Sequence, residues 1–308
     1  MTSKISRRSL IGKTLGISAG LAAGTSFEHR ILMAQLSSRR EKQAVEEAPV
    51  QGLQEGIFGG QRVSRLVIGG NLISGSAHAG ELVYQSDLMT RYFDTERIFK
   101  TWTIAERNGI NTTLMRSDPH IIEHYGRYLR ERQGKLQWIA QTAPEQGDPV
   151  QNAKLARDNG SFAVYLHGGV SDGLVEEGKV DQIGEAVEGF KKLGVFSGVA
   201  GHKLETIQAV EKASIDPDFY MFTINKVNYL SSDPSEIDAF MEKIEKPWIG
   251  FKVLGAGREH PQEGFRHAFQ RGADLIAVGM FDWQVRKDVK TAKELIAGDL
   301  ARKRPWRA

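Results

Sequence analysis

The sequence alternates short apolar runs with helix-like segments from about residue 63 onward. Eight runs are continuously apolar instead of alternating apolar with polar residues, which is typical of parallel strands buried on both faces. These runs occupy 65–70, 112–117, 136–142, 162–168, 196–202, 220–226, 248–255 and 275–281. Eight strand–helix units in strict order over about 240 residues predict an α/β fold, a single (βα)8 (TIM) barrel.

The segments between the runs have the spacing of amphipathic helices, and several end on glycine just before the next run. Helices are predicted over 94–109, 120–134, 150–160, 180–194, 203–214, 234–245, 261–272 and 285–302, with Asp94 as the N-cap of the first. The barrel is predicted over 61–302. A polar, charged linker over 35–60 precedes it, and a basic tail over 303–308, most simply a solvated end, follows it.

Residues 1–34 place the pair Arg7-Arg8 before a weakly apolar run that contains Lys13. This run is too short and too polar for a stable membrane span. The segment resembles a twin-arginine (Tat) signal peptide, cleaved after Ala34. The resemblance implies export by the Tat translocase and a periplasmic location. The alternative is a basic amphipathic N-terminus on a cytoplasmic protein.

Composition limits the chemistry. The chain has no cysteine, so disulfides, thiolate metal sites and a cysteine nucleophile are excluded. Residues 1–34 hold five basic residues and one acidic residue, so without them the net charge changes from +3 to −1. The basic balance therefore gives no reason to expect nucleic-acid binding, and the predicted partner is a small molecule.

In a barrel of this kind, chemistry takes place where the strands end. The polar residues at these positions are Asn71, Ser74, His78, Ser117, Asp118, His120, Gln141, Thr142, His167, His202, Asn225, Lys226, Lys252 and Asp282. Five of the eight histidines fall in the loops that follow the strands. This concentration predicts a binding site at that rim of the barrel.

Several segments resemble the aldo/keto reductase superfamily: "VSRLVIGGN", "AERNGIN", "VYLHGG", "LGVFSGVAGH" and "INKVNY". In "VYLHGG", His167 matches the active-site histidine of the family. The likeness spans nearly the whole chain after residue 60, and no single motif is intact. It implies a barrel that reduces carbonyl compounds with NADPH.

The departures from that family are at its catalytic positions. The stretch "TTLMRSDPHI" has Leu114 and no tyrosine where the family has its general acid, and Thr142 replaces the family lysine. The nicotinamide contacts fall on Ala200-Gly201 and Lys226, and the loop after the last strand lacks the adenosine-phosphate motif. Reduction of a carbonyl needs a proton donor, so these changes argue against NADPH as a cofactor.

The rim histidines leave two hypotheses open. His167, His202 and Asp118, with His78 or His120, could bind Zn, Mn or Fe. No H-x-H or H-E-x-x-H spacing supports this divalent metal site. Alternatively, the histidines are hydrogen-bonded groups that position a polar ligand.

The lysines and glycines near the last strands also allow two interpretations each. Lys252 could form a Schiff base with a carbonyl, or could be a fixed positive charge for a hydroxyl or carboxylate. Gly255, Gly257 and Arg258 could bind a phosphate, or the glycines could serve a tight turn. Asp282 and its aromatic neighbours could bind a sugar, or the aromatics could belong to the core.

The sequence therefore predicts an exported barrel enzyme that acts on a small polar carbonyl or carbohydrate-like substrate by proton transfer, as an isomerase or lyase. The predicted catalytic residues are His167, Lys252, His202 and Asp118. The predicted substrate-binding residues are Asn71, His78, Arg116, His120, Gln141, Lys226, Arg258 and Asp282. Two alternatives stay open: an NAD(P)H-dependent oxidoreductase with a non-standard proton donor, and a non-catalytic barrel that binds a small molecule.

Overall fold

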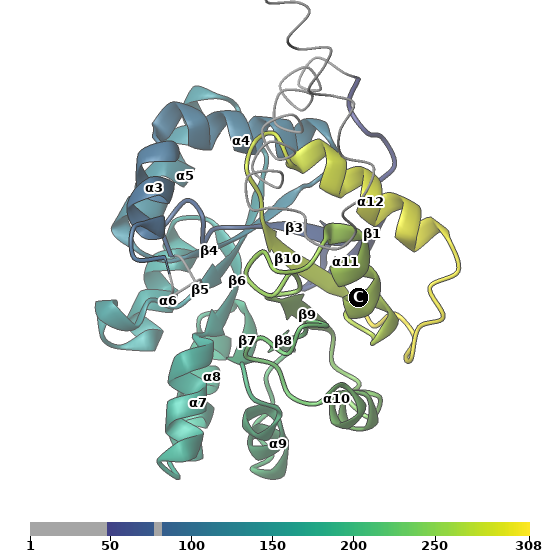
Figure 1. Ribbon diagram of the computed structural model, residues 1–308. Helices are drawn as coiled ribbons and strands as arrows, with labels where there is room; N and C mark the ends of the chain where they lie inside the picture. Colours follow the sequence, from purple (N-terminus) through teal and green to yellow (C-terminus); the bar gives the residue numbers. More distant parts are fainter. Residues whose placement is uncertain (1–47, 77–81) are drawn as a thin grey trace, which may run out of the picture. The chain divides into compact units, whose positions relative to one another are not determined.

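The computed structural model describes residues 48–76 and 82–308, so the predicted signal segment and most of the predicted linker lie outside it. Eight parallel strands form a closed barrel in which each strand pairs with its neighbours in chain order and β10 pairs with β3 (Figure 1). The strands are β3 (Leu66–Gly69), β4 (Thr112–Arg116), β5 (Gln137–Gln141), β6 (Ser161–Leu166), β7 (Phe196–Gly201), β8 (Phe219–Thr223), β9 (Trp248–Phe251) and β10 (Leu275–Gly279). The predicted (βα)8 barrel is confirmed.

Helices surround the strands. They are α3 (Gln85–Tyr92), α4 (Thr95–Arg107), α5 (Pro119–Glu131), α6 (Pro149–Asp158), α7 (Gly168–Glu176), α8 (Val180–Lys192), α9 (Leu204–Lys212), α10 (Pro234–Met241), α11 (Pro261–Gln270) and α12 (Val285–Ala297), with a short 3₁₀ turn η2 (Pro144–Gln146). Asp94 caps α4 by accepting a hydrogen bond of 2.8 Å from the backbone N–H of Arg97, as predicted. In the described ranges, none of the helices has the length and apolar content needed to cross a bilayer.

Two of these helices, α3 and α7, were not predicted. The α7 sequence starts with Gly168-Gly169, which has low helix propensity and gives no helix signal. Tertiary contacts decide otherwise, because α7 packs against β7 and α8. The segment that directly follows β6 is consequently the first turn of a helix.

A hairpin of β1 (Glu55–Phe58) and β2 (Gln61–Ser64) closes the end of the barrel where the strands begin. Phe58 is fully buried there, and its ring centroid lies 4.9 Å from that of Phe196 and 4.8 Å from that of Phe219. The predicted linker to residue 60 is thus corrected: its last residues form β1, because Phe58 gains a buried apolar environment inside the barrel.

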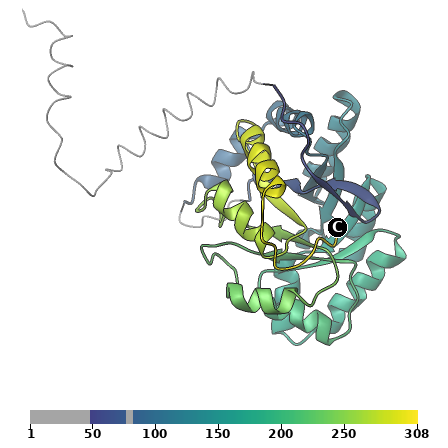
Figure 2. The ribbon, with the colours of Figure 1, turned by 90° about the vertical axis from the view of Figure 1, so that its right-hand side faces the viewer.

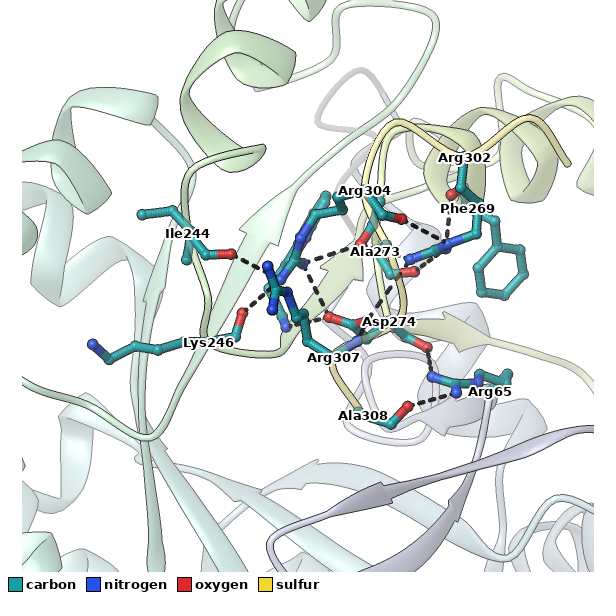
Figure 3. A network of polar contacts seen from close by, with 12 residues as sticks. Arg65, Ile244, Lys246, Phe269, Ala273, Asp274, Arg302, Arg304, Arg307 and Ala308 are labelled. Carbon is teal, nitrogen blue, oxygen red and sulfur yellow. Dashed lines mark hydrogen bonds and ion pairs between the residues drawn. The ribbon is translucent and has the colours of Figure 1, made fainter.

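The C-terminal residues pack onto the same end of the barrel, beside the hairpin (Figure 1 and Figure 2). Arg304 is only 3% exposed and donates to Asp274 and to the carbonyls of Ile244 and Lys246 (Figure 3). The expectation of a solvated basic tail is therefore wrong, because the arginine donors satisfy backbone carbonyls and one buried carboxylate.

Candidate active site

A cavity of about 370 Å³ opens at the end of the barrel where the strands finish, within the usual range for small-molecule sites. The polar side chains on its wall are those of Asn71, Ser76, Gln85, Arg116, Gln141, Tyr165, His167, His202, Lys252 and Gln284. The apolar side chains include those of Leu114, Met221, Phe251, Val278 and Phe281. The residues that line this cavity come from all eight strands and from segments that follow them, so the whole ring of strands builds the site.

His167 directly follows β6 and is the N-cap of α7. Its Nδ1 accepts a hydrogen bond of 3.1 Å from the backbone N–H of Gly169, and its own N–H donates to Thr142 at 3.0 Å. Burial, followed by the charges of His202 and Arg116, lowers the pKa of His167. A neutral ring whose Nδ1 is an acceptor has its proton on Nε2, so His167 offers an N–H donor from Nε2.

His202 follows β7 and is held by Asp172 on α7. The Nδ1 of His202 and Oδ2 of Asp172 are 2.7 Å apart, and Thr206 donates to Asp172 at 2.6 Å. Burial opposes ionisation of Asp172, but the hydrogen bonds from His202 and Thr206 outweigh it and keep the pKa of this carboxyl below its usual value. The ionised carboxylate fixes the proton on Nδ1 of His202 and leaves Nε2 as the reactive nitrogen.

Lys252 directly follows β9 with a left-handed backbone, at φ 53°. Its Nζ lies 5.7 Å from the ring centroid of Phe251 and 6.0 Å from that of Tyr229. Burial lowers the pKa of Lys252 to about 8. The strained backbone at this position is the kind that persists where the surrounding structure holds a functional side chain in place.

Tyr165 and Asp172 are site residues that sequence reasoning missed. Tyr165 is fully buried inside the barrel, and its hydroxyl donates to Oε1 of Gln141 at 2.9 Å. Its burial raises the pKa of this phenol well above the usual value. Tyr165 lies on β6, two residues before His167, and this period-two spacing could have indicated it. Nothing comparable indicates Asp172, whose partner is 30 residues away.

Six of the predicted site residues line the cavity: Asn71, Arg116, Gln141, His167, His202 and Lys252. Five others have partners elsewhere and do not line it: Asp118, His120, Lys226, Arg258 and Asp282. His78 lies outside the described residues.

Each of these five side chains contacts a partner outside the cavity wall. Asp118 caps α5 and accepts from the N–H of Ile121, while the ring of His120 lies 4.3 Å from that of His124. The guanidinium of Arg258 stacks over Tyr229 at 4.5 Å.

Asp282 and Lys226 form ion pairs with residues that do not line the cavity. Asp282 is 4% exposed and binds Tyr92, Arg97 and Lys100 at 2.5, 2.9 and 2.8 Å. Lys226 pairs with Glu263 at 2.9 Å. Asp282 therefore joins β10 to α3 and α4, and the predicted substrate-binding role is corrected to a structural one.

The predicted metal site is also corrected. In residues 48–76 and 82–308, no three histidine, aspartate or glutamate side chains come together as a set that could hold a metal ion. Asp118, the third ligand of the hypothesis, is used as a helix cap.

The loop after β9 exposes backbone donors. Gly255, Ala256 and Gly257 have φ of 53°, 59° and 82° in succession. Within the described ranges, the N–H groups of Ala256 and Gly257 donate to no other residue. Consecutive free N–H groups in such a loop suit an anionic group.

Comparison with solved structures shows which proteins share this fold. No family model and no curated protein matches the sequence. A solved protein from Pseudomonas aeruginosa assigned to the aldo-keto reductases superposes with a TM-score of 0.60 at 15% identity, covering 82% of this chain and 99% of that one. An aldo-keto reductase from Bacillus halodurans in its holo form gives a TM-score of 0.54 at 14% identity, over 79% and 91%. These likenesses show that the chain shares the barrel fold of those proteins.

A third structure corrects the cofactor prediction. Gox0644, solved in complex with NADPH, superposes with a TM-score of 0.52 at 13% identity, covering 80% of this chain and 94% of that one. The prediction against NADPH is therefore overturned, because a protein with the same barrel fold has been solved with NADPH bound.

Proposed function

We propose that this protein is an oxidoreductase that binds a nicotinamide nucleotide at the mouth of the barrel and acts on a small polar carbonyl compound. The observation that supports this function best is Lys252. It is an amine in the cavity with a pKa near 8, so it is protonated at pH 7 and releases its proton more readily than an ordinary lysine. Such a group meets the need for a proton donor that the missing tyrosine creates.

The residues present fit a nicotinamide nucleotide. Phe251 lines the cavity and offers an aromatic ring for stacking, and the N–H groups of Ala256 and Gly257 suit a phosphate. When bound, the nucleotide supplies or accepts a hydride.

The chain's own groups then have separate tasks. Lys252 holds the proton that passes from Nζ to the carbonyl oxygen. His167 donates a hydrogen bond from Nε2 and polarises the same carbonyl. His202, oriented by Asp172, receives or returns protons at Nε2.

The test is a fluorescence titration of the full chain with NADPH and NADH, followed by assays with small aldehydes and ketones. We expect binding to the wild type, weaker binding to Phe251→Ala, and unchanged binding to Lys226→Met, whose side chain is outside the cavity. Lys252→Met should bind NADPH but lose turnover. No binding of either nucleotide would refute the proposal.

A second candidate is proton-transfer chemistry of the isomerase or lyase type on a carbonyl or carbohydrate-like substrate. Its support is the same lowered pKa, because a neutral amine attacks carbonyls to form a Schiff base. Treatment with borohydride and small sugars or ketones, with mass analysis of the peptide that contains Lys252, tests it. If no adduct forms, this candidate is eliminated.

We also propose export by the Tat route to the periplasm, on the basis of Arg7-Arg8 and the apolar run that follows. Cell fractionation of the wild type and of the double variant Arg7→Lys, Arg8→Lys tests it. The variant should stay in the cytoplasm, and an unchanged distribution would contradict the proposal.

A further inference from the structure

The wall of the cavity has a one-sided charge. Arg116 and Lys252 line it together with His167 and His202, whereas none of the aspartates or glutamates in the described ranges does. Asp172 bonds to His202 without being part of the wall. Among the ionisable side chains of the wall, a ligand in this cavity therefore meets only cations and hydrogen-bond donors.

Lys252 is a cation of the cavity wall whose positive charge is not balanced by a nearby carboxylate of the described residues. Lys226, after the preceding strand, is 53% exposed in its side chain and pairs with Glu263 at 2.9 Å. Lys252 is half-buried, faces the rings of Phe251 and Tyr229, and pairs with no carboxylate of the described residues. A buried ammonium group without a counter-ion is unfavourable, and an anion in the cavity would supply that counter-ion.

Arg116 is held in place at the end of β4, three strands away from β9 around the barrel. Its Nε lies 3.4 Å from Asp118, and its Nη2 bonds to Glu145. Its Nη1 donates to no residue in the part of the chain that the structure describes. The two carboxylates orient the guanidinium, and its remaining donor can form a hydrogen bond with a ligand carboxylate.

We propose that the substrate of this site is a small carbonyl compound with a carboxylate, a 2-oxo acid or the corresponding 2-hydroxy acid. The carboxylate binds Arg116 and the carbonyl oxygen lies at Lys252. The carbonyl chemistry relies on the proposed function, whereas the preference for an anion does not. A cofactor phosphate would satisfy the same cations, so the experiment must separate the two anions.

The experiment is calorimetric titration of the full chain, without nucleotide, with pyruvate and with its neutral amide, pyruvamide, at pH 7. Pyruvate should bind at least about tenfold more tightly than pyruvamide. Arg116→Gln should weaken pyruvate binding about tenfold or more and leave pyruvamide unchanged, because it removes only the carboxylate partner. Lys252→Met should weaken pyruvate binding about tenfold or more and pyruvamide binding less, because both ligands have the carbonyl and only pyruvate has the charge. Arg116→Lys keeps the charge without the fork and should give an intermediate value. Lys226→Met is the matched control and should bind like the wild type.

Inorganic pyrophosphate is titrated in parallel. Equal affinity for pyruvate and pyruvamide would overturn the inference. So would dependence of pyrophosphate binding alone on Arg116 and Lys252, because the cations would then serve a cofactor phosphate. NADPH titration of the same variants separates the two proposals: a preference for pyruvate without NADPH binding refutes only the oxidoreductase proposal, and NADPH binding without that preference refutes only the anion proposal.

Discussion

The buried carboxylate of Asp274 at the closed end of the barrel gives the sharpest test of what holds the fold together. Asp274 is fully buried and precedes β10. It accepts hydrogen bonds from Arg304 at 3.1 Å, from the N–H of Arg307 at 2.7 Å and from the N–H of Trp248 at 3.1 Å. Asp274→Ala removes the carboxylate that pairs with Arg304, whose side chain is 1% exposed and has no other carboxylate partner among the described residues.

The expected loss is large. Breaking a buried ion pair by removing one partner costs about 3–5 kcal/mol, and two backbone donors lose their acceptor as well. At about 2–4 °C per kcal/mol for a domain of this size, the melting temperature should fall by about 6–20 °C. Asp274→Asn keeps the shape and one acceptor, so its effect should be smaller.

Urea denaturation followed by circular dichroism measures the free energy of unfolding. The control is Glu188→Ala, which breaks an exposed pair with Lys192 and should change stability by no more than about 0.5 kcal/mol. Combining Asp274→Ala with Arg304→Met should cost less than the sum of the two single changes, because the buried Arg304 charge is then no longer left unpaired. A loss below about 1 kcal/mol for Asp274→Ala, or strict additivity in the double variant, would refute the reasoning.

Four further predictions concern the site and the core. Asp172→Asn removes the acceptor that fixes the proton on His202, so the rate of turnover should fall about tenfold or more with the fold intact by circular dichroism. The lowered pKa of Asp172 stabilises the fold above about pH 4 and this contribution is lost as the pH falls through the folded-state pKa, so urea denaturation between pH 6 and 3 should show a shallower loss in Asp172→Asn. Because the pKa of Lys252 is about 8, pyruvate binding should weaken between pH 7 and 9, and a constant dissociation constant over that range would contradict a role for its charge. Phe58→Ala should cost about 3–5 kcal/mol in urea denaturation, because the ring fills the closed end of the barrel.

The barrel itself was predictable because its evidence is local. Each strand is a continuous apolar run, and the cap at Asp94 depends on a residue three positions away. The hairpin and α7 were missed for the opposite reason. Phe58 lies in a short stretch with few apolar residues, and its burial depends on Phe196 and Phe219, which are far along the chain.

For the candidate site, the sequence could predict the end of the barrel where it lies, but not which side chains point into the cavity. Strand ends place His167, His202 and Lys252 at one end of the barrel, and the structure puts all three on the cavity wall. The same rule placed Asp282 and Lys226 there, and both have partners elsewhere. A strand end fixes where a residue is, whereas its side-chain direction depends on the loops that meet it.

By itself, the sequence determined the order of strands and helices, the absence of cysteine chemistry and the end of the barrel where polar groups collect. These follow from apolar periodicity and composition, which are properties of short segments. Only the tertiary structure decided that Asp172 orients His202, that Lys252 has no carboxylate partner among the described residues, and that Arg304 is buried. Those outcomes depend on hydrogen bonds and charges contributed by segments 30 or more residues apart, and closure of the barrel is what brings such segments together.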